Sequence, residues 1–209
     1  MIKTENLTFH YKQKEHIFHF PNVALKPQEN LLILGKSGIG KTTLLHLLAG
    51  LLKPVSGTIH IDEVDISSLR TRKLDVFRGQ NIGLVFQKNH AVRSLSIFEN
   101  LQARLFFSKK SIHNTAIDEL LKELGLIEYK NRKVNALSEG QLQRLGIALS
   151  VIHNPKVILA DEPTSSLDDE NCGIVIELLK KQAKQSNANL IVITHDHRVK
   201  SSFSNTITL

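Results

Sequence analysis

Residues 35–43 have the sequence GKSGIGKTT and lie between two apolar segments. Residues 31–34 before them predict a short buried strand, and residues 42–49 predict a largely buried helix. A strand, a glycine-rich turn and a helix form the context in which the pattern G-x-x-x-x-G-K-[ST] indicates a phosphate-binding loop. The alternative is a glycine turn that only caps a helix, and the context favours the phosphate-binding loop.

The residue types of this loop suit a nucleotide. Gly35, Gly38 and Gly40 can adopt positive φ angles at little steric cost, so that backbone N–H groups can point into one anion-binding hollow. The helix that follows directs its positive N-terminal end at the same point. Lys41 adds a full charge for the β- and γ-phosphates, and the Thr42 hydroxyl can bind Mg²⁺. The predicted nucleotide contacts in the loop are Gly35, Lys36, Ser37, Gly38, Ile39, Gly40, Lys41, Thr42 and Thr43.

The composition is that of one ordinary globular domain, which we assign to residues 1–209. The single cysteine, Cys172, excludes an internal disulfide and favours a reducing compartment. No apolar segment approaches the roughly 18 residues needed to span a bilayer. The first 16 residues lack the apolar core of a signal peptide. We therefore expect a soluble intracellular protein.

The formal net charge of +7 would suit a nucleic acid, an anionic membrane surface or a nucleotide. The basic residues are scattered in short runs without interleaved aromatic residues, so we expect solvated surfaces and no nucleic-acid partner. His10, His16 and His19 are irregularly spaced and have no cysteine partner, and we expect no metal site there.

Alternating strands and helices predict an α/β fold, with a P-loop NTPase core and a mostly parallel sheet. Residues 2–25 predict an N-terminal antiparallel β subdomain. The period becomes helical over residues 97–152, which indicates an α-helical subdomain, roughly residues 90–153, inserted in the core. One apolar stripe in it contains Ile112, Ala116, Ile117, Leu120, Leu121 and Leu124. Further core strands are predicted at residues 82–86, 157–160, 190–194 and 206–209, and a further helix at 171–185.

Two further patterns point to phosphate chemistry. The sequence VILADE places Asp161 and Glu162 just past a buried strand, at the sheet edge where the phosphate loop also begins. Asp161 would help to hold Mg²⁺, and Glu162 would orient or deprotonate a water. In LSEGQ, Ser138 and Gln141 match a capping box, and Gly140 would let the backbone approach a phosphate closely.

The order and spacing of these motifs resemble the ATPase subunit of ATP-binding cassette (ABC) transporters over nearly the whole chain. Residues 35–43 resemble the Walker A loop, residues 157–162 the Walker B strand, and residues 137–141 the signature. Residues 78–87 and 94–101 resemble the bacterial branch of lipoprotein-release, macrolide-export and cell-division ATPases.

The resemblance extends to four smaller sites. Gln87 matches the Q-loop glutamine, residues 165–168 the D-loop, and His195 the switch histidine, while Tyr11 lies where an aromatic residue stacks on adenine. The resemblance implies catalytic roles for Lys41, Glu162 and His195, metal binding by Thr42, Gln87 and Asp161, and nucleotide contacts by Tyr11, Gln87, Ser138, Gly140 and Gln141.

The resemblance also implies partners. Two copies would form a head-to-tail homodimer around two Mg-ATP, with Ser138 and Gly140 serving the partner's γ-phosphate and Asp168 crossing the interface. A separate integral membrane permease subunit would be driven by this dimer, which would lie peripherally on the cytoplasmic face of the inner membrane. ATP binding would drive closure, and hydrolysis would reset it.

Two departures from the family pattern stand out. Glu139 occupies a signature position where the best-known form has glycine, and we expect its carboxylate to point away from the γ-phosphate. The sequence ends at Leu209, without the polar turn and strand that often follow.

Two alternative functions fit the sequence less well. An ABC ATPase that acts on ribosomes or DNA usually has two cassettes or a long coiled-coil insertion, and neither is present in the sequence. A small-molecule kinase would leave the signature and the D-loop unexplained.

Overall fold

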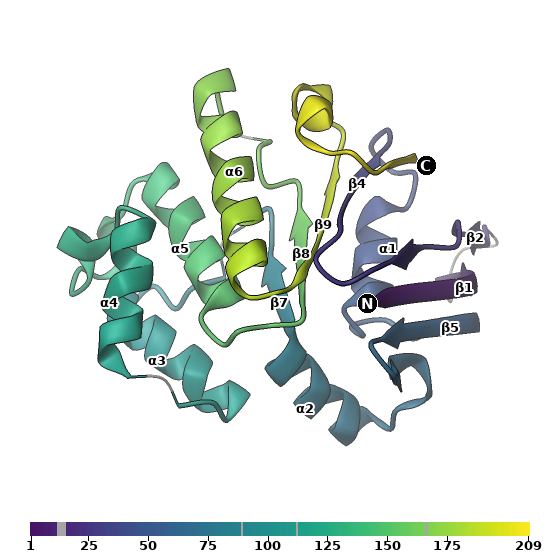
Figure 1. Ribbon diagram of the computed structural model, residues 1–209, viewed down its shortest axis with the longest axis horizontal. Helices are drawn as coiled ribbons and strands as arrows, with labels where there is room; N and C mark the ends of the chain where they lie inside the picture. Colours follow the sequence, from purple (N-terminus) through teal and green to yellow (C-terminus); the bar gives the residue numbers. More distant parts are fainter. Residues whose placement is uncertain (12–15, 89, 112, 166) are drawn as a thin grey trace.

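The core of the protein is a parallel sheet. In the computed structural model, which describes residues 1–11, 16–88, 90–111, 113–165 and 167–209, its strands lie in the order β10-β4-β9-β8-β7 (Figure 1). These strands are β4 (Asn30–Leu34), β7 (Ile82–Val85), β8 (Val157–Asp161), β9 (Asn189–Thr194) and β10 (Thr206–Thr208). Every pairing in this sheet is parallel, which confirms the predicted α/β core.

A second sheet is antiparallel and contains the N-terminal strands. Its members are β1 (Ile2–Phe9), β2 (Phe18–His19), β3 (Ala24–Leu25), β5 (Ser56–Ile61) and β6 (Val64–Asp65). The strand β1 pairs with β2, β3 and β5, and β5 pairs with β6. The predicted antiparallel β subdomain is therefore confirmed, although residues 12–15 of that stretch lie outside the described residues.

Alternate residues of each core strand enter two different hydrophobic clusters, as the two-residue period of a strand requires. In β4, Leu31 and Ile33 pack in one cluster with helix α1 (Lys41–Leu48) and the antiparallel sheet. Leu32 and Leu34 pack in the other cluster with the remaining helices. Both faces of the parallel sheet are covered, which explains why its strands are continuous apolar segments in the sequence.

The chain between β7 and β8 is mainly helical. It contains α3 (Ile97–Ser108), α4 (Asn114–Glu123) and α5 (Glu139–Val151). In the predicted apolar stripe, Ile117, Leu121 and Leu124 are buried, whereas Ile112 lies outside the described residues. The boundaries of the inserted subdomain, roughly residues 90–153, stay a prediction.

The remaining helices flank the sheet. Helix α6 (Asp169–Gln185) packs along the core strands, and α2 (Thr71–Asn81) precedes β7 (Figure 1). Short 3-10 turns occur at Ile66–Ser68, Ile127–Tyr129, Val134–Ala136 and His197–Ser202. None of the helices in the described part of the chain is long and apolar enough to cross a membrane.

Candidate functional site

A cavity of about 320 Å³ lies at the carboxyl ends of the parallel strands, beside the glycine-rich loop. The loop leaves β4 and enters α1 with left-handed backbone angles at Gly38 (φ 82°) and Gly40 (φ 109°). The residues that line the cavity are Tyr11, Phe18, Ser37, Gly38, Gly40, Lys41, Thr42, Thr43, Gln87, Glu162 and His195. Segments far apart in the sequence therefore meet where α/β proteins commonly bind ligands.

The Lys41 side chain is almost fully buried at the base of the loop. Its Nζ donates hydrogen bonds to the carbonyl oxygens of Gly35 (2.8 Å) and Lys36 (3.1 Å). The same Nζ lies 3.5 Å from Oε1 of Glu162. A cation held beside the N-terminus of α1 creates a positive site that suits a phosphate group.

Thr42 and Asp161 form a pair of oxygen donors in the site. The Thr42 hydroxyl donates to Oδ1 of Asp161 at 3.4 Å. Burial raises the pKa of Asp161, the Thr42 hydrogen bond opposes this, and the negative charge of Glu162 adds to it. A bound cation would stabilise the ionised form of Asp161 against burial and the nearby negative charge.

Mg²⁺ fits this donor set. Among the described residues, no group of three or more His, Cys, Asp or Glu side chains could hold a metal ion. Mg²⁺ in nucleotide sites is typically held by one or two protein oxygen groups together with substrate phosphates. The pair of Thr42 and Asp161 meets that requirement.

Glu162 joins the ends of β8 and β9. Its Oε2 accepts hydrogen bonds from the Thr194 hydroxyl (2.7 Å) and from the backbone N–H of His195 (3.2 Å), and its Oε1 lies 3.0 Å from Nδ1 of His195. Burial opposes ionisation, but the hydrogen bonds from Thr194 and His195 outweigh it and lower the pKa of Glu162. The carboxylate is therefore charged and fixed in position at neutral pH.

The backbone of Glu162 is also held in an uncommon conformation. Its φ of 48° lies in the left-handed region, while its N–H donates to the carbonyl of Ile193 on β9. Such conformations persist where the surrounding structure enforces them, and they are frequent at functional sites. The bend turns the chain out of β8 directly after Asp161.

Gln87 and Tyr11 enclose the cavity from two other elements. Gln87 follows β7, and its Nε2 donates to Oγ of Ser165 at 3.4 Å. The Tyr11 hydroxyl lies 3.0 Å from Oγ1 of Thr43, and its ring packs edge-on against Phe9. Tyr11 is 37% exposed, so part of its side chain remains accessible to a ligand.

The signature residues lie outside this cavity. Ser138 and Gln141 form the predicted capping box at the start of α5, and the Gln141 side chain accepts from the Ser138 backbone at 2.9 Å. Gly140 lies in the first turn of the same helix. A single subunit therefore does not bring these residues to its own phosphate loop.

Other predicted contacts also lie apart from the cavity lining. Gly35, Lys36 and Ile39 belong to the loop but are not among the lining residues, and Lys36 and Ile39 are exposed. Asp161 is not among the lining residues either, although it contacts Thr42. Asp168 caps α6 by accepting from the backbone N–H of Asn171 at 2.8 Å. Ser166, in the predicted D-loop, lies outside the described residues.

Two residues of the site were not predicted from the sequence. Phe18, on β2, lines the cavity and restricts the space beside Gly40, where an added Cβ would lie 2.8 Å from the ring. Thr194 holds Glu162 in place. The position of Thr194 directly before His195 was the one available signal for its role.

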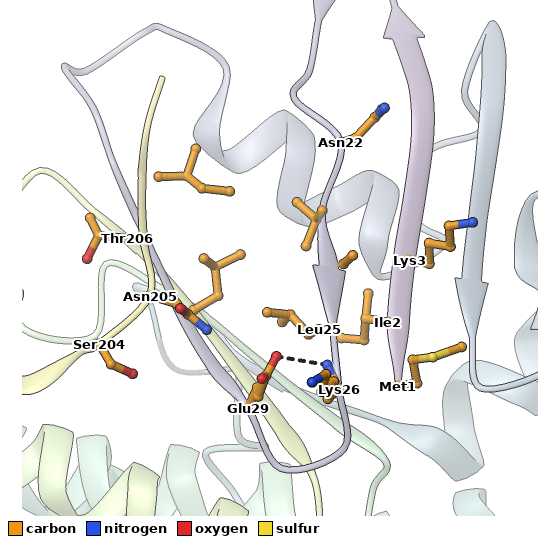
Figure 2. Close-up of a pocket in the computed structure, with 14 residues that line it drawn as sticks. Met1, Ile2, Lys3, Asn22, Leu25, Lys26, Glu29, Ser204, Asn205 and Thr206 are labelled. Atoms are coloured by element: carbon orange, nitrogen blue, oxygen red, sulfur yellow. Dashed lines mark hydrogen bonds between the residues drawn. The ribbon is translucent and has the colours of Figure 1, made fainter.

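A larger hollow of about 640 Å³ lies at the opposite end of the core, between the antiparallel sheet and β10 (Figure 2). Apolar residues such as Leu25 and Ile207 form much of its lining. The Glu29 carboxylate at its rim accepts a hydrogen bond from the backbone N–H of Lys26. Among the described residues, the lining of this hollow includes Lys3, Lys26 and Glu29 but no imidazole and no residue of the glycine-rich loop, so we assign the chemistry to the smaller cavity.

Comparisons with known proteins agree with this assignment. The model of the ABC transporter family matches residues 18–165. The lipoprotein-releasing system ATP-binding protein LolD of Buchnera aphidicola is 36% identical over 192 residues, which cover 90% of this chain and 84% of LolD. The methionine import ATP-binding protein MetN 1 of Bacillus thuringiensis is 37% identical over 204 residues, which cover 95% of this chain and 60% of MetN 1.

A solved structure extends the likeness to three dimensions. The dimeric ATP-binding cassette MJ0796, in a post-hydrolysis state bound to ADP and Pi, superimposes with a TM-score of 0.88 at 34% identity. The match covers 100% of this chain and 94% of MJ0796. The fold, the cavity at the ends of the parallel strands and these relatives lead to one conclusion: the chain belongs to the ABC transporter family of ATP-binding proteins.

Proposed function

We propose that this chain is the ATP-hydrolysing subunit of a membrane ABC transporter, and that it works as a homodimer with a separate integral membrane permease subunit. The observation that carries the proposal is the convergence of Lys41, Thr42, Glu162 and His195 at one cavity beside a phosphate-binding loop, with Asp161 in contact with Thr42. The subunit would act peripherally on the cytoplasmic face of the inner membrane.

The loop would bind the triphosphate of ATP. Backbone N–H groups around Gly38 and Gly40 and the N-terminus of α1 would receive the phosphate oxygens, with Lys41 supplying the full charge. Tyr11 would pack against the adenine. Thr42, Asp161 and Gln87 would hold Mg²⁺, which would supply positive charge to offset the negative charge that develops during phosphoryl transfer.

Glu162 and His195 would direct the attacking water. The ionised Glu162 carboxylate can accept a hydrogen bond or a proton from a water next to the γ-phosphate. His195 would keep the carboxylate oriented, because its backbone N–H and its ring both contact it. Lys41 Nζ lies 3.5 Å from the same carboxylate oxygen, Oε1, that the His195 ring contacts, and Lys41 would move its contact to the nucleotide when ATP binds.

Dimerisation would complete the site. The cavity of one subunit offers one lysine and the N-terminus of α1 to the triphosphate, whereas Ser138, Gly140 and Gln141 are at a second, exposed helix N-terminus. In a head-to-tail dimer that second N-terminus would reach the partner's γ-phosphate and stabilise its negative charge. Hydrolysis would therefore depend on closure of the two subunits around ATP.

A groove next to Gln87 supports the assignment of a protein partner. It has a volume of about 570 Å³, has a mostly apolar surface and lies between α2, α3 and the segment after β7. Phe107 lines the groove, is 75% exposed and packs edge-on against the similarly exposed Phe106, so two neighbouring aromatic rings face solvent here. A permease segment bound in this groove would lie close to Gln87, and therefore close to the nucleotide site.

The Glu162→Gln variant tests the proposal. We expect hydrolysis to fall by about 100-fold or more while Mg·ATP still binds, so that ATP-bound dimers accumulate and can be detected by light scattering. Glu128→Gln, an exposed residue outside the site, is the matched control and should hydrolyse ATP normally. A Glu162→Gln protein that stays monomeric at saturating Mg·ATP would refute the dimer.

A further inference from the structure

Two exposed charges of opposite sign occupy the two segments that the proposed dimer would bring together. Lys36 is the second residue of the phosphate loop, and Glu139 is the first residue of α5, within the signature. Both side chains are exposed, and within the described residues neither forms an ion pair or a side-chain hydrogen bond. Each charge is therefore available to a partner outside its own subunit.

Lys36 contributes its backbone, but not its charge, to its own nucleotide site. Its carbonyl oxygen accepts a hydrogen bond from Nζ of Lys41, but Lys36 is not among the residues that line the cavity. Lys41, the other lysine of the loop, is already held by Gly35, Lys36 and Glu162. Lys36 is thus the loop cation that can interact with an approaching surface.

Glu139 poses an electrostatic problem for the dimer. A carboxylate in the first turn of α5 is favourable for the helix itself. It is also the direct neighbour of Ser138 and Gly140, which are the residues proposed to face the partner's γ-phosphate. An unpaired carboxylate there would repel the triphosphate and oppose closure.

We propose that Lys36 forms an ion pair with the partner subunit's Glu139 when two copies close around ATP. This inference rests on the proposed head-to-tail dimer, whose two-fold symmetry would form the pair twice. The positive charge of Lys36 would offset the negative charge of the partner's Glu139 beside the triphosphate. Because both residues come from this chain, the pair would favour association of two copies of this chain. Glu139 would then favour closure instead of opposing it.

A charge-reversal cycle tests the pair. The variants Lys36→Glu, Glu139→Lys and the double reversal are made in the Glu162→Gln protein, and their ATP-dependent dimerisation is measured by sedimentation velocity at low salt. We expect each single reversal to weaken dimerisation by about tenfold and the double reversal to restore most of it. Glu139→Gln, which keeps a polar residue without charge, should give an intermediate loss.

Controls separate the pair from general charge effects. Lys53→Glu and Glu128→Lys reverse exposed charges elsewhere and should leave dimerisation unchanged. Losses that merely add in the double reversal, or single reversals without effect, would overturn the pair and leave the proposed function intact. A parent protein that does not dimerise with ATP would overturn the proposed dimer and the pair together.

Discussion

The carboxylate of Glu162 and the ring of His195 lie 3.0 Å apart, Oε1 to Nδ1, where β8 and β9 end side by side. This contact requires a proton on Nδ1 because the carboxylate is ionised. The ring nitrogen Nε2 is then left to interact with substrate. His195 therefore orients the carboxylate and also lines the cavity in which we propose that ATP binds.

Replacement of His195 by alanine should therefore affect catalysis more than binding. We expect His195→Ala to lower kcat by about 100-fold, because the Glu162 carboxylate loses its contact with the imidazole ring. The carboxylate keeps its hydrogen bonds from the Thr194 hydroxyl and from the backbone N–H of residue 195. Steady-state ATPase assays and nucleotide titration would separate the two effects. His197→Ala removes an exposed histidine two residues away and is the matched control. Equal kcat values for both variants would contradict the role of His195.

A buried histidine outside the site should make stability depend on pH. Nε2 of His153 lies 2.8 Å from the guanidinium of Arg104, and Lys110 donates to the His153 carbonyl. Burial, followed by the charges of Arg104 and Lys110, lowers the pKa of His153 to about 3. In the unfolded chain His153 binds a proton near pH 6.5, whereas in the folded chain it binds one only near pH 3. The free energy of unfolding therefore falls as pH drops from about 6.5 towards 3.

The His153→Gln variant removes this pH dependence. Its amide oxygen can still accept from Arg104, but the side chain does not titrate. Between about pH 7.5 and 5, we expect the wild type to lose about 2 kcal/mol more stability than His153→Gln in urea unfolding. The exposed His197→Gln should behave like the wild type, and parallel pH profiles for wild type and His153→Gln would refute the assignment.

A close backbone contact places β7 against α5. A Cβ added at Gly83 would lie 2.1 Å from the carbonyl oxygen of Ser150, so the helix or the strand must move. We expect Gly83→Ala to destabilise the protein by about 3 kcal/mol in urea unfolding. Gly173→Ala, in α6 where no atom lies within 4 Å of an added Cβ, should instead stabilise by about 0.5–1 kcal/mol. Similar effects of both changes would contradict this packing.

The apolar segments predicted the core of the fold well. Strands β4, β8 and β9 are buried on both faces, and such strands appear as continuous apolar segments in the sequence. The sequence therefore predicts where these strands end, and from this it predicts that Lys41 and Glu162 lie close together. The capping box at the start of α5 was equally visible, because it depends on residues three positions apart.

Features that depend on strand register or on weak sequence patterns could not be predicted from the sequence. Helix α2 has no fully buried residue, and its apolar stripe consists of the partly buried Leu74 and Phe77, which is too short to reveal the helix in the sequence. The contact between Thr194 and Glu162 follows from the register that pairs Asp161 with Ile193, which no local pattern specifies. The same holds for Arg104, which donates to the carbonyl oxygens of Gly79 and Ile82 and so ties α3 to α2 and β7.

The dependence of ATPase activity on protein concentration tests the central claim most directly, because two copies must meet before either can hydrolyse ATP. At saturating Mg·ATP and concentrations below the dimerisation constant, the rate per subunit should rise in proportion to concentration and level off when light scattering shows the dimer. A rate per subunit that stays constant on dilution, from a species that scatters as a monomer, would contradict the account.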